Sequence, residues 1–320
     1  MPRHELRHDL RRDSGIDPLR QISGFIADLP TPFDDDDRID WPAFEMACEC
    51  QIRSGARAMV VGETMGEAST LSHEERAELI GRAVRIARGR IAVIAGAGSN
   101  STGRATELSV MAEAESADAI LSIVPYYNKP MQAGLLAHFQ SIAASTTLPI
   151  VLHDNPARTA RELSDDTILR LAQSPQFIGL NDATASVARL FRLRTMLPPE
   201  FCLFCGDDVS AFGWLASGGD GCVSAVANVF PDLCRRFHQA AATGDLASSR
   251  RLSDRLAVLV AAMSGDSPVA ALKCAMSLSG LMKPRVRLPL VELGEDARKT
   301  VARAMAAVTE PAKALSDQLQ

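Results

Sequence analysis

Short apolar runs alternate with amphipathic stretches along most of the chain. Runs of five to eight residues, typical of buried strands, occupy 22–29, 57–62, 91–96, 119–124, 149–154, 177–181, 202–206 and 221–226. Stretches with apolar residues at helical spacing separate them, among them 41–54, 72–88, 134–146 and 164–174. Two of these stretches carry helix-start signals, since Ser72 with Glu75 matches a capping box and Ser164 suits an N-cap.

Eight strands with intervening helices predict the α/β class and a (β/α)8 TIM barrel, because parallel strands need crossover helices. After the eighth strand, residues 231–311 have mostly helical patterns. We therefore expect an N-terminal extension at 1–20, a barrel at 21–230, and a helical appendage at 231–320 packed on the barrel. The extension is Arg-rich but also acidic and has no apolar segment, so we interpret it as solvated or loosely helical rather than as a targeting signal.

Composition narrows the possible partners. The 320 residues are 47% hydrophobic and carry a net charge of −5 without a basic stripe, which gives nucleic-acid binding no electrostatic support. No apolar stretch reaches transmembrane length, so no membrane partner is expected. The odd number of cysteines, seven, favours reduced thiols and a cytoplasmic location. Cys202 and Cys205 form a C-x-x-C on a predicted strand, where they point to opposite faces, so we expect buried structural thiols.

The barrel prediction directs attention to the C-terminal ends of the strands, where barrel enzymes place their sites. Residues suited to binding or catalysis at that edge are Thr31, Glu63, Thr64, Gly98, Tyr126, Tyr127, His153, Asp154, Arg158, Asn181, Asp182, Asp207 and Asn228.

An ordered set of segments runs through these loops. It comprises TPF (31–33), TMGEASTLSHEER (64–76), AGAGSNST (95–102), PYYNKP (125–130), NPART (155–159), GDD (206–208), GGDGCVSAVANVFP (218–231) and ALKCAMSLSGL (271–281). The set resembles the dihydrodipicolinate synthase / N-acetylneuraminate lyase superfamily over roughly residues 22–293. The resemblance implies a class I aldolase-like lyase scaffold, a site for pyruvate or another 2-keto acid, and a homotetramer built from tight dimers.

Three positions depart from the family pattern where its chemistry occurs. Asn181 stands where relatives carry the lysine that forms a Schiff base with pyruvate, and an amide nitrogen cannot do this because its lone pair is delocalised. His153 stands at the position of a proton-shuttling tyrosine, and Met65 at the second of two paired threonines. Thr64 is kept, and so is Tyr127, which in the family reaches across the tight dimer into the neighbouring site.

The resemblance also implies a set of ligand-binding residues, namely Thr64, Met65, Arg158, Asn181 and Val223. Arg158 corresponds to a carboxylate-binding arginine, and a guanidinium can hold a carboxylate in bidentate fashion. Thr64 is expected to bind a ligand carboxylate with help from backbone N–H groups of 64–66. None of the remaining lysines is expected to replace the missing amine, since none is predicted to point inward from a strand end; they are Lys129, Lys273, Lys283, Lys299 and Lys313.

These observations leave three hypotheses open. In the first, the chain binds a small 2-keto acid or carboxylate but has lost Schiff-base condensation and cleavage. In the second, it is an active lyase or aldolase with a lysine-independent acid/base or metal-assisted mechanism centred on His153. In the third, Asn181 is an engineered replacement, which does not account for His153 and Met65.

No cofactor or metal is expected. The glycines of 95–102 do not fit a dinucleotide-binding fingerprint. A metal set of Glu63, His153, Asp182 and Asp207 would need all four side chains to point inward, which strand alternation forbids. Whether catalysis survives, and whether the assembly is a dimer or a tetramer, stays open at the level of the sequence.

Overall fold

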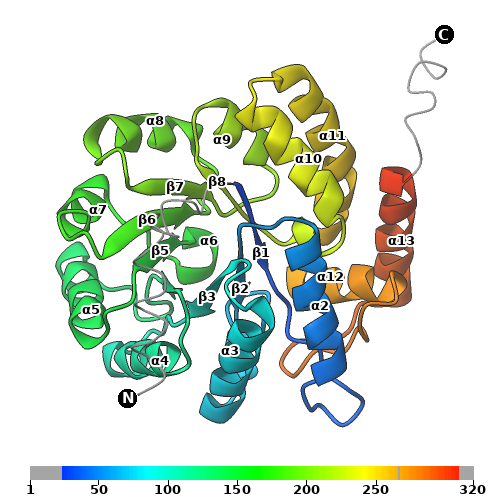
Figure 1. Cartoon of the computed structure of the whole chain (residues 1–320), viewed down its shortest axis with the longest axis horizontal. Helices are drawn as coiled ribbons and strands as arrows, with labels where there is room; N and C mark the ends of the chain where they lie inside the picture. Colours follow the sequence, from blue (N-terminus) through cyan, green and yellow to red (C-terminus); the bar gives the residue numbers. More distant parts are fainter. Residues whose placement is uncertain (1–23, 266, 310–320) are drawn as a thin grey trace.

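Eight parallel strands close into a barrel in chain order (Figure 1). The computed structural model describes residues 24–265 and 267–309, so the predicted extension at 1–20 lies outside the described residues. The strands are β1 (Gly24–Asp28), β2 (Ala58–Val61), β3 (Ala92–Gly96), β4 (Ala119–Ile123), β5 (Ile150–Asp154), β6 (Phe177–Asp182), β7 (Cys202–Cys205) and β8 (Gly221–Ser224). The predicted TIM barrel is therefore confirmed, with every strand inside or within one residue of its predicted run.

The strands are buried on both faces, and this explains why they appear as continuous apolar runs. In β2, Ala58 and Val60 belong to the apolar cluster inside the barrel, whereas Met59 and Val61 belong to the layer between barrel and helices. Alternation with a period of two thus assigns each side chain to one layer. The same rule places the side chains at the strand ends.

Helices cover the outside of the barrel (Figure 1). They are α2 (Trp41–Arg53), α3 (His73–Ala87), α4 (Thr102–Ala114), α5 (Gln132–Ser145), α7 (Asp165–Leu171), α8 (Val187–Met196) and α9 (Ala211–Ala216). The short helix α6 (Pro156–Thr159) follows β5 and lies inside this ring of helices. The capping box of Ser72 and Glu75 is present at the start of α3, and Ser164 caps α7 by accepting from the backbone N–H of Thr167. Local signals in the sequence thus set where these helices begin.

Within the described residues, four α-helices follow β8: α10 (Pro231–Ala242), α11 (Leu246–Met263), α12 (Pro268–Leu278) and α13 (Glu295–Thr309). Helix α13 packs against α11 and α12 and is the outermost of them in Figure 1. In the described part of the chain no single helix is long and apolar enough to cross a membrane, although α11 and α12 satisfy that test together across a bend of 117°.

Lys273 connects these C-terminal helices to the barrel. Its buried ammonium donates to Glu67 and to the carbonyl of Arg285 at 2.8 Å, and lies 4.1 Å from the ring centre of Phe33. Glu67 in turn accepts from the backbone N–H of Arg287 at 2.9 Å. Because Glu67 belongs to the loop that follows β2, the C-terminal helices stabilise the loop that carries Thr64.

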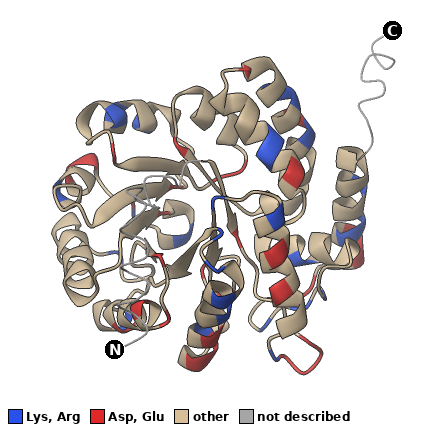
Figure 2. Cartoon of the chain, viewed as in Figure 1, with Lys and Arg blue, Asp and Glu red and all other residues tan. Residues whose placement is uncertain are grey.

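The charged residues and the cysteines are distributed as follows from the composition. Figure 2 shows acidic and basic residues interspersed along α2 and α3. All seven cysteines are free. Cys205 is buried in the layer under the helices, but Cys202 is only half-buried, against the inner cluster, so the expectation that both are buried is wrong for Cys202. Its place at the start of β7, near the end of the barrel, leaves it partly open to solvent.

Candidate active site

A cavity of about 520 Å³ lies at the C-terminal ends of the strands. It brings together every residue of the expected ligand-binding set and the histidine, namely Thr64, Met65, His153, Arg158, Asn181 and Val223. These side chains come from the loop after β2, from β5, α6, β6 and β8. Residues distant in sequence therefore share one polar cavity of a size typical for small-molecule sites.

His153 and Asn181 form the floor of the cavity. They are register partners on the neighbouring strands β5 and β6, and both are buried. Partners in parallel strands lie side by side and point to the same face. The imidazole and the carboxamide therefore stand next to each other, at the positions where the resemblance implies a tyrosine and a lysine.

The next residue on each strand points the other way. Arg189, from α8, donates to Asp154 at 2.8 Å and to Asp182 at 3.1 Å, and also to the carbonyl of Leu163 at 2.6 Å. Burial raises the pKa of Asp154 to about 6, although the charge of Arg189 and its hydrogen bond lower it. This buried cluster holds the ends of β5 and β6 together and so fixes the spacing of His153 and Asn181.

The sequence did not point to Arg189. The sequence indicates only that some buried cation is needed, because Asp154 and Asp182 occupy outward positions on successive strands that helices cover. Nothing in the local sequence tells which of the arginines on the surrounding helices supplies it.

Glu63 is the partner of His153. Its Oε1 lies 3.2 Å from Nδ1 of His153, and both side chains are at least 93% buried. Burial alone would raise the pKa of Glu63, but the charge of His153 and the hydrogen bonds from His153 and Thr64 lower it to about 2. Glu63 is therefore a carboxylate, which only accepts hydrogen bonds, so Nδ1 of His153 carries the proton.

Asp28, at the end of β1, is an acidic residue that lines the cavity, as Asp207 and Asp208 also do. Burial and the nearby charge of Glu63 raise its pKa well above the usual range, although Arg158 acts in the opposite direction. Its Oδ1 is buried and has no hydrogen-bond partner among the described residues. Burial and the charge of Glu63 thus favour the protonated form of Asp28.

Glu63 and Asp28 bear on the expected role of the loop after β2. The backbone N–H of Thr64 donates to Glu63, and that of Met65 faces Asp28 at 3.5 Å. Protein carboxyl groups thus compete for the N–H groups of Thr64 and Met65, and their expected help in binding a ligand carboxylate stays a prediction. Arg158, which makes no ion pair with the described residues, is the cation left for a ligand.

The carboxamide of Asn181 packs over a glycine. A Cβ at Gly206, directly after β7, would lie 2.8 Å from Oδ1 of Asn181, closer than any real contact of this kind. The amide oxygen is buried and has no hydrogen-bond partner in the described part of the chain. An unpaired buried acceptor costs about 1–3 kcal/mol, so this atom is suited to a donor on a ligand.

The hypothetical metal set does not assemble. Glu63 and His153 meet, but Asp182 binds Arg189, and Asp207 accepts from the backbone N–H groups of its own turn. Among the described residues no group of three or more His, Cys, Asp or Glu side chains is placed to hold a metal ion.

Among the residues that the resemblance implies for the site, Tyr127 is the one that does not line the cavity of its own chain. Thr31, Glu63, Gly98, Tyr126, Asp154, Asp182 and Asn228, also candidates at this edge, do not line it either. The side chain of Tyr127 is 89% exposed, and its φ of 73° is uncommon for a residue other than glycine. The lysines are also elsewhere: Lys273 is bound to Glu67, Lys129 is exposed, and no described residue that lines the cavity is a lysine.

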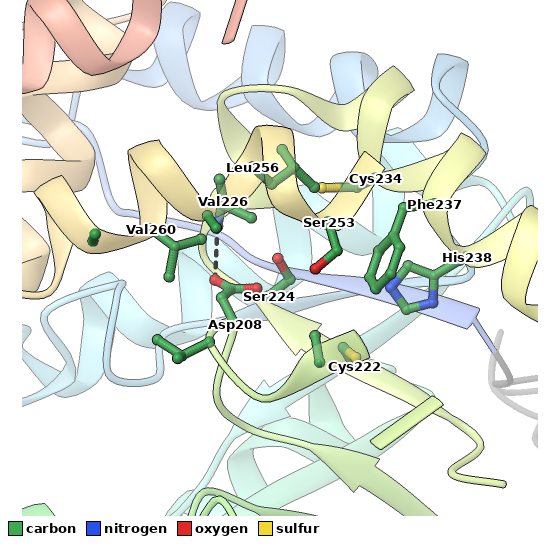
Figure 3. Close-up of a pocket in the computed structure, with 14 residues that line it drawn as sticks. Asp208, Cys222, Ser224, Val226, Cys234, Phe237, His238, Ser253, Leu256 and Val260 are labelled. Carbon is green, nitrogen blue, oxygen red and sulfur yellow. Dashed lines mark hydrogen bonds between the residues drawn. The ribbon is translucent and has the colours of Figure 1, made fainter. Parts of the chain in front are cut away.

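A second cavity, of about 250 Å³, lies outside the barrel wall between β8 and helices α10 and α11 (Figure 3). Its wall is mostly apolar, with Cys222, Cys234, Phe237 and Leu256 among the lining residues. Burial lowers the pKa of His238, also in this wall, to about 4, so its ring is neutral. The described lining contains no Lys or Arg and therefore no fixed cation for a carboxylate.

The fold and the first cavity define the class of protein: a (β/α)8 barrel with its site at the C-terminal ends of the strands. Residues 21–308 match the model of the Dihydrodipicolinate synthetase family, and the chain belongs to that family. The resemblance drawn from the sequence is thereby confirmed.

Individual relatives agree with this assignment. The chain is 40% identical to 4-hydroxy-tetrahydrodipicolinate synthase of Phenylobacterium zucineum over 290 residues, which cover 91% of this chain and 98% of the relative. It is 43% identical to the synthase of Hyphomonas neptunium over 285 residues, or 88% and 97% of the two chains. Its structure is similar to that of the chloride-inhibited synthase of Acinetobacter baumannii complexed with pyruvate, with a TM-score of 0.87, 37% identity, and coverage of 90% and 99%.

Proposed function

We propose that this chain binds a small 2-keto acid or carboxylate in the barrel cavity without forming a Schiff base at residue 181. The observation that carries the proposal is the position of Asn181, on the floor of the cavity at the end of β6. An amide does not add to a ketone to give an iminium. The described lining offers no other amine, since it contains no lysine.

Ligand binding itself finds support in the electrostatics of the cavity. Arg158 can hold a carboxylate through two parallel N–H···O bonds, and no described acidic side chain occupies its guanidinium. Ionised Glu63 lies beside His153 and disfavours a second carboxylate there, so Arg158 is the group that attracts one. The structural relative from A. baumannii is complexed with pyruvate, which makes pyruvate the first ligand to test.

Borohydride reduction tests the absence of a Schiff base. The protein is incubated with pyruvate and borohydride, and its intact mass is measured. We expect no stable adduct on the unchanged chain, whereas Asn181→Lys restores an amine at the same strand end and serves as the positive control. A stable pyruvate adduct on the unchanged chain would sink the proposal.

Titration calorimetry with pyruvate tests binding separately. We expect saturable binding that weakens at least tenfold in Arg158→Met. Arg161→Met is the matched control, since Arg161 lies just beyond the same short helix but bonds the carbonyl of Lys129 instead of lining the cavity. Equal affinities in the two variants would argue against a role for Arg158.

A second candidate function is an active lyase or aldolase that uses lysine-independent acid/base chemistry. The hydrogen bond between Glu63 and His153 favours it, because a histidine oriented by a carboxylate is a common general base. Turnover of a panel of 2-keto-acid aldols, abolished in His153→Gln, would support this candidate. No turnover of the panel, with pyruvate still bound, would leave the first proposal standing alone.

We also propose a homotetramer built from tight dimers in which Tyr127 reaches into the neighbouring site. The exposed apolar side chains of Tyr127 and Met131, four residues apart, support an association surface there. Light scattering coupled to gel filtration checks the mass, with a monomer as the contrary result. The cytoplasmic location and the domain boundaries at 20 and 230 stay predictions.

A further inference from the structure

The Glu63–His153 pair fixes which nitrogen of the imidazole can act on a ligand. Because ionised Glu63 accepts from Nδ1, the singly protonated form of His153 holds its proton on Nδ1 and its lone pair on Nε2. His153 lines the cavity, so Nε2 is the ring nitrogen left for a ligand. A neutral imidazole in this tautomer is a base, and the carboxylate behind it stabilises the imidazolium that forms when it takes a proton.

Two further polar atoms of the cavity have no partner in the described part of the chain. They are Oδ1 of Asp28 and Oδ1 of Asn181, both buried. A ketone offers no proton to the amide oxygen of Asn181, whereas an enol offers its hydroxyl. Asn181 therefore favours an enol over the ketone from which it forms, and such differential binding is what lowers a barrier.

We propose that this site enolises a bound 2-keto acid without a covalent intermediate, with His153 as the general base and Glu63 as the residue that positions it. The inference rests on the proposed function, because the keto acid must first be bound at Arg158. Asn181 thereby acquires a role of its own as the acceptor for the enol hydroxyl.

The step balances with groups already in the cavity. Nε2 of His153 takes a proton from C3, the C3–H electron pair forms the C2–C3 double bond, and the carbonyl π pair moves to the C2 oxygen. That oxygen takes a proton from the carboxylic acid of Asp28 and donates the resulting hydroxyl to Asn181. Reversal returns both protons, so no oxidant or further reactant is consumed.

Pyruvate in heavy water is the probe. During each cycle the imidazolium exchanges its proton with solvent and returns a deuteron to C3, so the methyl signal of pyruvate decays in the proton NMR spectrum. General-base catalysis contributes about 10²–10⁴-fold. We therefore expect the exchange rate to fall at least a hundredfold in His153→Gln, while His73→Gln, which removes a histidine outside the cavity, keeps the rate.

Glu63→Gln tests whether Glu63 positions the imidazole of His153 or only stabilises the fold. The charged groups around the imidazole are Glu63 after β2, Asp28 on β1, Arg158 on α6, and Asp207 and Asp208 after β7. Removing the charge of Glu63 leaves the imidazolium less stabilised, so the pH profile of exchange shifts to lower pH and the rate falls at least tenfold. Glu63→Asp, which keeps the charge, retains the original profile midpoint. A rate that falls with no change in the profile would overturn the positioning role.

The outcomes distinguish this inference from the proposal beneath it. If calorimetry shows pyruvate bound and the exchange is no faster than in buffer, or equally fast in His153→Gln, the enolisation is refuted and the binding function stands. If pyruvate does not bind, or borohydride traps an adduct, the proposed function fails and the inference fails with it.

Discussion

Replacing Arg189 with methionine should destabilise the fold more than any other single loss of charge near the site. The guanidinium is 1% exposed and bridges Asp154 and Asp182, whose side chains are completely buried. Methionine fills part of the space but leaves two carboxylates without their cation. Breaking a buried pair from one side costs about 3–5 kcal/mol.

The hydrogen bonds that Asp154 and Asp182 keep in the variant determine how much of the unfolding free energy is lost. Asp182 keeps its bonds from the backbone N–H and hydroxyl of Thr184 at 2.8 and 2.6 Å, whereas Asp154 keeps one, from the N–H of Leu163 at 3.0 Å. Asp154 will respond by taking up a proton, since burial already raises its pKa to about 6. One pKa unit corresponds to about 1.4 kcal/mol, so we expect a loss of about 4 kcal/mol at pH 7.

Urea denaturation at pH 7 and at pH 5 measures this loss. The deficit should shrink at pH 5, because the folded-state pKa of Asp154 is raised and acid supplies the proton it needs. Arg192→Met is the matched control on the same helix, since Arg192 is 56% exposed, pairs with Asp165, and should cost less than about 1 kcal/mol. Equal losses in the two variants, or a deficit that does not depend on pH, would refute the assignment of Arg189 as the buried bridge.

Three further predictions address acid stability, the cavity floor and a helix start. Burial lowers the pKa of His138 and His238 from 6.5 to about 4, so these histidines take up protons in the unfolded chain before they do so in the folded one. As pH falls from 6.5 to 4, each should lower the free energy of unfolding by up to about 3 kcal/mol. Urea denaturation across this range should show a smaller fall in that free energy for His138→Gln and for His238→Phe than for the unchanged chain. Gly206→Ala should weaken pyruvate binding about tenfold or more by displacing the amide of Asn181, and an unchanged dissociation constant in calorimetry would contradict this contact. Ser72→Ala should cost about 1 kcal/mol in urea denaturation through loss of the α3 cap.

Much of the site was predictable because it depends on local alternation. Once β5 and β6 were assigned from their apolar runs, the period of two separated His153 from Asp154 and Asn181 from Asp182, and the structure confirms both separations. The sequence alone shows that Asn181 departs from the family pattern. Its environment, an amide packed over Gly206 with an unpaired oxygen, was not visible.

The partners of these residues come from far along the chain, and no local pattern identifies them. Glu63 and His153 are 90 residues apart and meet because the closed barrel brings the C-terminal ends of β2 and β5 to the same edge. Glu63 is one of several polar residues predicted at that edge, and the sequence joined it to His153 only in a metal set that strand alternation excluded. The N–H groups of the following loop were assigned to a ligand, yet they face Glu63 and Asp28.

The sequence by itself determined the order of strands and helices, the family, and which side of each strand faces the cavity, because these follow from local periodicity and from ordered motifs. Only the tertiary structure decided that Glu63 orients His153, that Arg189 bridges the two outward aspartates, and that Tyr127 stays outside the cavity of its own chain. The physical reason is that burial and pairing of charges depend on which distant side chains barrel closure brings within hydrogen-bond reach.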